Sequence, residues 1–256
     1  MPSLMKLRLY HLALQARLGP TMWLVRNPLK IYEFTQLTKD VHLIREDVCL
    51  DLGCGGGIQT QVLASRCRRA VGVDTESAAI ADAQELVGAT WLKNKIEFHC
   101  NTIQEAKFAD GVFDHVFSFC VLEHIPDLSD VLRELHRVMK PNGGLHVTVD
   151  SLQNIQDPRL LAKHRADHCV HQYFTRDSLI STLEAAGFQV DCVFPMFSSA
   201  FARLEFERRI REGFQTSHSV VGKLRLLRHL ETEEQKQLQN NSNSPSIMLI
   251  AHARRR

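Results

Sequence analysis

Short apolar runs alternate with longer amphipathic stretches between residues 47 and 194. Each apolar run is about five residues long, as expected of a strand that is buried on both faces. In one of the longer stretches, Val131, Leu132, Leu135 and Val138 fall on a single helical face. This alternation predicts an α/β fold in which a doubly wound parallel sheet is covered by helices on both sides.

The expected elements follow from the ends of these runs, where glycine, proline and capping residues gather. Strands are predicted over 48–52, 70–73, 96–100, 115–119, 145–149, 189–194 and 247–251. Helices are predicted over 58–65, 77–87, 128–139 and 176–186, the last beginning after a Thr175 cap and ending at Gly187. Residues 151–173 are predicted to form a loop that serves as a lid or binding segment.

The chain divides into a predicted helical N-terminal cap, residues 1–45, and a main domain, residues 46–256. Within the main domain, residues 195–244 are predicted to be a helical insertion, with two helices before residue 240, that contacts a substrate or a second subunit. The mixed charges of this insertion are typical of a solvated face. A monomer and a homodimer both remain open.

Composition narrows the class of protein. Hydrophobic residues make up 44% of the chain and charged residues 23%, which is typical of a folded globular protein, and the net charge of +2 is too small to favour nucleic-acid binding. No apolar run reaches the roughly 20 residues of a transmembrane segment. Seven scattered cysteines without a C-x-x-C pair indicate no zinc site and fit a reducing, cytoplasmic location.

The first 32 residues contain five cationic and no acidic side chains. Leu7, Tyr10, Leu14 and Leu18 lie near one face of the helix that this segment would form. The favoured interpretation is a basic amphipathic helix packed on the domain. Weak contact with a membrane surface and a mitochondrial presequence remain the alternatives.

The densest signal is the run of glycines after the first predicted strand. Glycines between a strand and a helix let the backbone turn tightly and approach a ligand. A dinucleotide loop would have a third glycine where Ile58 stands, and a phosphate-binding P-loop would need a Gly-Lys-Ser/Thr sequence that is absent. Asp51 precedes the glycines, where it would repel a phosphate but attract an ammonium group. Asp74 ends the second strand, where an acid accepts ribose hydroxyls.

Three motifs together resemble the class I methyltransferases, particularly the ubiquinone-biosynthesis-like branch that acts on small molecules. They are Asp51-Leu-Gly-Cys-Gly-Gly-Gly, Val71-Gly-Val-Asp74 and Phe117-Ser-Phe-Cys-Val-Leu-Glu-His-Ile-Pro-Asp127. The resemblance covers about residues 46–194 and the last strand. It implies a Rossmann-like seven-stranded sheet with an antiparallel last strand, S-adenosylmethionine as the cofactor, and no required metal.

The resemblance also assigns positions in a cofactor site. Asp51, Gly53 and Gly55 would contact the methionine part, with Cys54 between the glycines as a small filler. Asp74 and Thr75 would hold the ribose, and Ser118 and Cys120 would lie beside the sulfonium. At the adenine position the family usually has an acid, but this chain has Thr102 followed by Ile103, so a hydroxyl would replace the carboxylate there.

The resemblance implies a methyltransferase whose acceptor is a small molecule, and a hydroxyl oxygen of a quinone-like, sugar or secondary metabolite is favoured. Such an acceptor needs a base near neutral pH, for which histidine is suited. His124, beside the expected methyl position, is the first candidate. Asp150 lies on the same rim, and His171 lies in the predicted loop that follows it. A protein methyltransferase and a non-catalytic S-adenosylmethionine-binding scaffold remain alternatives.

Overall fold

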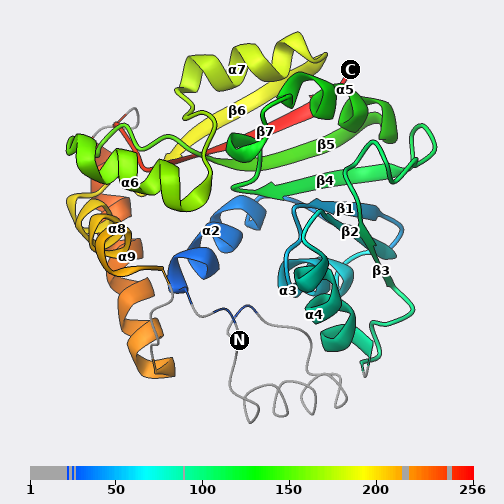
Figure 1. Cartoon of the computed structure of the whole chain (residues 1–256), viewed down its shortest axis with the longest axis horizontal. Coiled ribbons are helices and arrows are strands. Elements are labelled where there is room, and N and C mark those ends of the chain that lie inside the picture. The colour runs from blue at the N-terminus through cyan, green and yellow to red at the C-terminus, as the bar shows by residue number, and fades with distance from the viewer. Residues whose placement is uncertain (1–21, 23–24, 26, 89, 215–218, 241–243) are drawn as a thin grey trace.

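The computed structural model describes residues 22, 25, 27–88, 90–214, 219–240 and 244–256. Seven strands form one sheet in the order β3-β2-β1-β4-β5-β7-β6 (Figure 1). β7 runs antiparallel to both β5 and β6, and the pairings among β1 to β5 are parallel. The strands are β1 Val48–Leu52, β2 Arg69–Asp74, β3 Ile96–Cys100, β4 Phe113–Phe119, β5 Met139–Asp150, β6 Phe188–Met196 and β7 Met248–Arg255. The predicted doubly wound, Rossmann-like sheet with an antiparallel last strand is confirmed.

Helices cover both faces of this sheet, as predicted. They are α2 Pro28–Thr38, α3 Ile58–Ala64, α4 Ser77–Gly88, α5 Leu128–Val138, α6 Pro158–His168, α7 Arg176–Ala185, α8 Ala200–Glu212 and α9 Val220–Asn240, with a short 3₁₀ helix, η2, at Leu122–His124. In Figure 1, α5 and α7 lie on one side of the sheet, and α3 and α4 lie on the other.

Two apolar cores correspond to these two layers. Leu132 of α5 and Leu179 of α7 are fully buried in the core on one face. Leu37 of α2, Leu63 of α3 and Phe206 of α8 belong to the core on the other face. The predicted helical pair before the last strand is therefore present as α8 and α9. α8 contributes to the core that also contains Leu37 and Leu63, as well as to the surface.

The strand order reverses between β1 and β4, which places the crevice of the sheet at their carboxyl ends. Leu52, the last residue of β1, pairs with Val73 of β2 and with Ser118 of β4. The loops that follow these strands consequently leave the sheet side by side. Ligands of open α/β sheets bind at such a switch point.

Helix α2 is placed near this edge by its first and central residues. Asn27 caps it by accepting a hydrogen bond from the Leu29 backbone N–H at 3.1 Å, and Pro28 occupies the first turn. Phe34 stacks on Phe119 at the end of β4, with ring centroids 5.4 Å apart. Glu33, beside Phe34 on the same side of α2, accepts from the Thr148 hydroxyl of β5, so this side of the helix faces the ends of β4 and β5.

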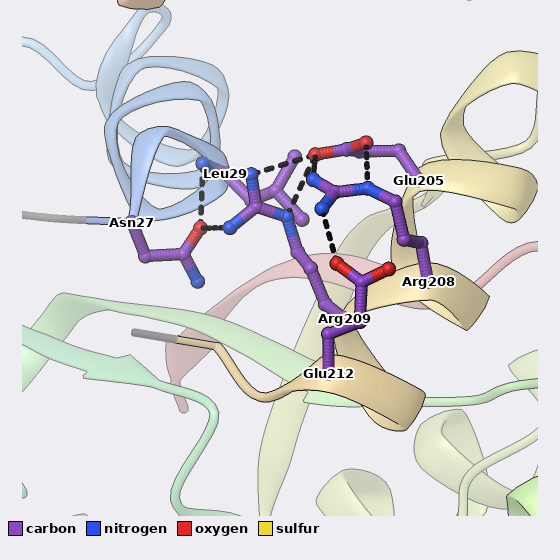
Figure 2. A network of polar contacts seen from close by, with 6 residues as sticks. All are labelled: Asn27, Leu29, Glu205, Arg208, Arg209 and Glu212. Atoms are coloured by element: carbon purple, nitrogen blue, oxygen red, sulfur yellow. Dashed lines mark hydrogen bonds and ion pairs between the residues drawn. The ribbon is translucent and has the colours of Figure 1, made fainter. Parts of the chain in front are cut away.

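Figure 2 shows how α8 holds the start of α2. The buried guanidinium of Arg209 donates from Nη1 to Asn27 Oδ1 at 3.0 Å and from Nε to Glu205 Oε1 at 2.9 Å. Arg208 binds the same Glu205 and also Glu212, but it does so at the surface. The network joins the insertion to the segment that precedes β1.

Two predicted features are wrong. The segment 151–173 is not a loop throughout, because α6 forms within it; only Leu160 and His164 of that helix are buried, so its apolar periodicity is weak. β5 begins at Met139, six residues before the predicted start of this strand at residue 145. A register shift in the pairing with β4, between Phe113 and His115, accommodates the extra residues.

The predicted basic helix that includes Leu7, Tyr10, Leu14 and Leu18 lies outside the described residues. In the part of the chain that the structure describes, no helix combines the length and apolar character that crossing a membrane requires.

Candidate active site

The loop after β1 requires glycine for two different reasons. Gly53 has φ +72°, and a Cβ atom at this position would lie 2.3 Å from a methyl carbon of Val121. Its N–H donates to the Val73 carbonyl at 2.8 Å, which ties the loop to β2. A Cβ on Gly55 or Gly56 would instead meet nothing within 4 Å. The turn is therefore tightly packed at its start and bare where a ligand could approach its backbone.

Asp74, at the end of β2, is fixed beside this loop. Its Oδ2 accepts from the Gly55 N–H at 2.8 Å, and its Oδ1 accepts from the Glu76 N–H at 2.9 Å. A carboxylate has about four acceptor positions, so two remain for a ligand hydroxyl pair. The geometry suits the ribose-binding role predicted for this residue.

A cavity of about 650 Å³, here called the glycine-loop cavity, opens beside Asp74. Five of the predicted cofactor residues line it: Gly53, Asp74, Thr75, Thr102 and Ile103. The lining residues come from the loops after β1, β2, β3 and β4. The Thr102 hydroxyl donates to Glu105 Oε2 at 2.9 Å, so its oxygen is already oriented.

Three other predicted cofactor residues, Cys54, Ser118 and Asp51, are buried and do not line this cavity. Asp51 is 1% exposed, accepts from the Thr60 hydroxyl at 2.6 Å through Oδ2, and has no partner for Oδ1. Burial, opposed by Thr60, raises the pKa of Asp51 to about 7. A ligand ammonium would satisfy the unpartnered oxygen and restore the charged form.

A second cavity of about 610 Å³, here called the β5 cavity, adjoins the carboxyl end of β5. His124 of η2 lines both cavities. Asp150 lines the β5 cavity, as does Cys120, which was predicted to lie beside the sulfonium. His171 is exposed and lies outside both walls, although its backbone N–H donates to the Glu123 carbonyl at 2.9 Å. Of the three predicted catalytic residues, His124 and Asp150 thus line one cavity together, and His171 does not.

Sequence reasoning did not assign Lys30 and Glu33, which α2 places in the β5 cavity. Their side chains form an ion pair at 2.9 Å. Glu33 is buried and also accepts from the Thr148 hydroxyl at 2.5 Å and from the Cys120 thiol at 3.2 Å. The sequence did contain a signal that these two residues lie together: they are three residues apart, which puts both on one face of a helix.

His164 and His168 of α6 complete the polar part of this wall, and their rings pack against those of Phe206 and Phe214. Burial, reinforced by His168 and His124, lowers the pKa of His164 to about 4. Burial likewise lowers the pKa of His124 and of His168. The imidazoles are therefore neutral at pH 7 and able to accept a proton or a hydrogen bond.

Cys120, Glu123 and Asp150 bring donor atoms within 4.8 Å of one another. Burial raises the pKa of the Cys120 thiol, which is therefore protonated at neutral pH, and it raises the pKa of the Glu123 carboxyl well above its usual value. Metal ligands must be deprotonated, and the ammonium of Lys30 already supplies positive charge beside Cys120 and Glu33. We assign no metal centre to this group.

The sheet order, the bare glycine turn and the paired acid Asp74 define the class of the protein. The chain contains a class I, S-adenosylmethionine-dependent methyltransferase domain. Residues 50–147 match the model of a family described as a methyltransferase domain.

Curated relatives agree with this assignment. The ubiquinone biosynthesis O-methyltransferase of Pseudomonas aeruginosa is 35% identical over 97 residues, which are 37% of this chain and 40% of that protein. An uncharacterized methyltransferase of Schizosaccharomyces pombe is 29% identical over 174 residues, 62% of this chain and 66% of that protein. The chain therefore matches less than half of the length of the first of these relatives.

Solved structures share the fold at low sequence identity. Geranyl diphosphate C-methyltransferase of Streptomyces coelicolor has a TM-score of 0.65 and 15% identity, over 88% of this chain and 77% of that one. The cyclase SpnF has a TM-score of 0.63 and 17% identity, over 97% of this chain and 94% of that one. Because one of these neighbours is named as a cyclase, the fold by itself does not fix the reaction.

Proposed function

We propose that the protein transfers a methyl group from S-adenosylmethionine to a hydroxyl oxygen of a small molecule bound in the β5 cavity. One observation carries this proposal: His124 borders both cavities, so the cofactor site and the acceptor site adjoin at this residue. Methyl transfer is an in-line displacement, and two sites that meet at one wall allow the alignment it needs.

The residues of the glycine-loop cavity fit the cofactor. Asp74 would accept the ribose hydroxyls, and the open backbone at Gly55 would face the methionine part. The unpartnered oxygen of Asp51 would receive the ammonium. Ile103 and Thr102 would contact the adenine. When bound, S-adenosylmethionine supplies a methyl group already activated by positively charged sulfur.

The β5 cavity fits a neutral acceptor of modest size. Its volume of about 610 Å³ lies in the range of small-molecule sites. Its charged groups are largely paired internally, as Lys30 is with Glu33, while Phe206, Phe214 and Met248 supply apolar surface. Ubiquinone biosynthesis O-methyltransferases among the relatives support an oxygen acceptor.

Calorimetric titration with S-adenosylhomocysteine tests the cofactor site. We expect binding to the wild type and no measurable binding to Asp74→Ala, because this change removes the acceptor of the ribose hydroxyls and a partner of the glycine loop. Ser129→Ala, on the exposed start of α5, is the matched control and should bind normally. Unchanged affinity in Asp74→Ala would contradict the site.

Radiolabelled S-adenosylmethionine tests turnover. Incubated with a metabolite extract, the wild type should produce a labelled small molecule whose label is stable as an ether. His124→Ala should lower this turnover while affinity for S-adenosylhomocysteine stays nearly intact. Label found only in protein would support a protein methyltransferase instead, and cofactor binding without any labelled product would support a scaffold.

A further inference from the structure

Three polar side chains form a continuous series behind the β5 cavity. Asp150 Oδ2 lies 3.6 Å from His164 Nε2, and His164 Nδ1 lies 3.2 Å from the Tyr173 hydroxyl. The Tyr173 hydroxyl in turn donates to the Leu161 carbonyl at 3.3 Å. Asp150 and His164 are each 4% exposed, and both line the cavity. The series therefore runs from the cavity wall into α6 and the segment after it.

The directions of these hydrogen bonds determine which nitrogen of the His164 ring carries the proton. The Tyr173 hydroxyl has a single proton, and that proton points at the Leu161 carbonyl. The same oxygen must consequently accept from His164, which places the ring proton on Nδ1. In a neutral imidazole the other nitrogen is then an acceptor. The unprotonated Nε2 of His164 faces the carboxyl group of Asp150.

A lone pair that faces a carboxyl group favours the protonated acid, because only that form can donate to it. The groups around Asp150 act on the same equilibrium: burial and Glu33 favour the protonated form, and Lys30 opposes it. The Glu123 carboxyl places no negative charge beside Asp150 while it is protonated, and its Oε1 accepts a hydrogen bond from the Asp150 N–H. The net result raises the pKa of Asp150 to about 7.

The surroundings of His164 keep the ring neutral. Burial, His168 and His124 oppose its protonation more strongly than Asp167 favours it. The proton that the pair takes up near neutral pH therefore lies on Asp150, whose Oδ2 is 3.6 Å from His164 Nε2. A base of this kind is suited to catalysis at physiological pH.

We propose that Asp150 is the catalytic base of the methyl transfer and that His164, held by Tyr173, is the residue that positions it. This assignment rests on the proposed function. The acceptor O–H bond breaks and its proton moves to the Asp150 carboxylate, whose Oδ2 faces His164 Nε2 at 3.6 Å. The acceptor oxygen forms the new C–O bond as the S–C bond breaks and sulfur keeps that electron pair. His124 then contacts the two substrates where the cavities meet and does not remove the proton.

Nitrogen NMR of histidine-labelled protein tests the arrangement without any acceptor. We expect the His164 ring, identified by the signals lost in His164→Gln, to be neutral with its proton on Nδ1 at pH 7. In Tyr173→Phe the proton should move largely to Nε2, since the ring is then free to donate to Asp150. Tyr32→Phe, which removes a hydroxyl from the core side of α2, is the matched control and should leave the ring unchanged.

Two outcomes would overturn the assignment: a His164 proton on Nε2 in the wild type, or no movement of that proton in Tyr173→Phe. A second measurement uses the acceptor found by labelling. The acid limb of the pH–rate profile should move to lower pH in Tyr173→Phe, because an Nε2–H donor stabilises the Asp150 carboxylate. A lower rate with an unmoved limb would reduce Tyr173 to a structural role. Because the NMR result does not depend on methyl transfer, it can fail while cofactor binding and turnover succeed.

Discussion

Gly53 shows how much of the site depends on a single residue. In Gly53→Ala the new Cβ would overlap the Val121 side chain and would hold a left-handed backbone. The left-handed conformation costs about 1–2 kcal/mol, and overpacking costs about 1–3 kcal/mol more. We expect the free energy of unfolding, measured in urea, to fall by a few kcal/mol and cofactor binding to be lost with it.

Gly56→Ala separates packing from binding in the same loop. The backbone there is not left-handed, and the added carbon meets no protein atom within 4 Å. Stability should stay within about 0.5 kcal/mol of the wild type, as for most surface changes. Turnover of the acceptor found by labelling should fall nevertheless, because Gly56 lines the β5 cavity and the added methyl group enters the space proposed for the acceptor. Normal turnover in this variant would show that this side of the loop does not face the acceptor.

The sequence predicted correctly the site residues whose position depends only on the strand that precedes them. Gly53 and Asp74 follow directly from the end of a strand, and both line the glycine-loop cavity. Lys30 and Glu33 reach the β5 cavity only because α2 packs at the ends of β4 and β5, through contacts such as Phe34 with Phe119. No local pattern contains that contact between distant segments. His171 was predicted near the acceptor but lies outside both cavities, because the sequence analysis did not predict α6, which precedes it.

At the level of elements, α2 and α6 begin in the same way. Asn27 and Asp157 each precede a proline and accept a hydrogen bond from the N–H two residues on. This pair of features is a local signal for a helix start. In α6 it is the main local signal, because the apolar periodicity of that segment is weak. Strong periodicity, by contrast, made α5 predictable to within a residue.

The junction of α8 with α2 gives a prediction at this scale. Arg209 is 0% exposed and joins Glu205 to the Asn27 cap (Figure 2). Arg209→Ala would leave the Glu205 carboxylate with fewer partners in a largely buried setting and would release the cap. Breaking a buried ion pair costs about 3–5 kcal/mol, so we expect a marked fall in the melting temperature.

Arg208→Ala is the control on the same helix. Arg208 also pairs with Glu205, but its side chain is 38% exposed, and surface pairs contribute about 0–1 kcal/mol. Its melting temperature should stay close to that of the wild type. Equal losses in both variants would show that the buried connection to α2 contributes no more than a surface ion pair.

At the scale of the whole molecule, buried histidines and buried acids make stability depend on pH in opposite directions. His146 illustrates the first group: burial, His252 and His115 hold its pKa well below 6.5. Its ring hydrogen-bonds to His115 at 3.0 Å and to His252 at 2.8 Å, which joins β4, β5 and β7. As the pH falls below about 6.5, the unfolded chain binds protons that the folded chain refuses, so stability decreases.

The buried acids change stability in the opposite direction. The pKa of Asp51 and of Asp150 is raised to about 7 in the folded protein, so between the unfolded value of 3.8 and about 7 the folded chain holds the extra protons. Their contribution is present in full only below the unfolded pKa and is lost as the pH rises through 7. Between pH 4 and 6.5 the histidines oppose this loss of stability, because more imidazoles have a lowered pKa than carboxyl groups have a raised one. Among the described residues, the seven histidines with a lowered pKa are His115, His124, His136, His146, His164, His168 and His252, and the three acids with a raised pKa are Asp51, Glu123 and Asp150. Above pH 6.5 only the acids remain.

We therefore expect the melting temperature to pass through a maximum between about pH 6.5 and 7, measured by calorimetry from pH 5 to pH 8.5. His146→Gln should flatten the acid side of that curve by up to about 1.4 kcal/mol per pH unit, the value for one proton. It should leave the alkaline side unchanged, because Asp51 and Asp150 lie at the other end of the strands. A curve that still rises at pH 8, or an acid side unaltered in His146→Gln, would mean that these buried groups do not control the stability of the sheet.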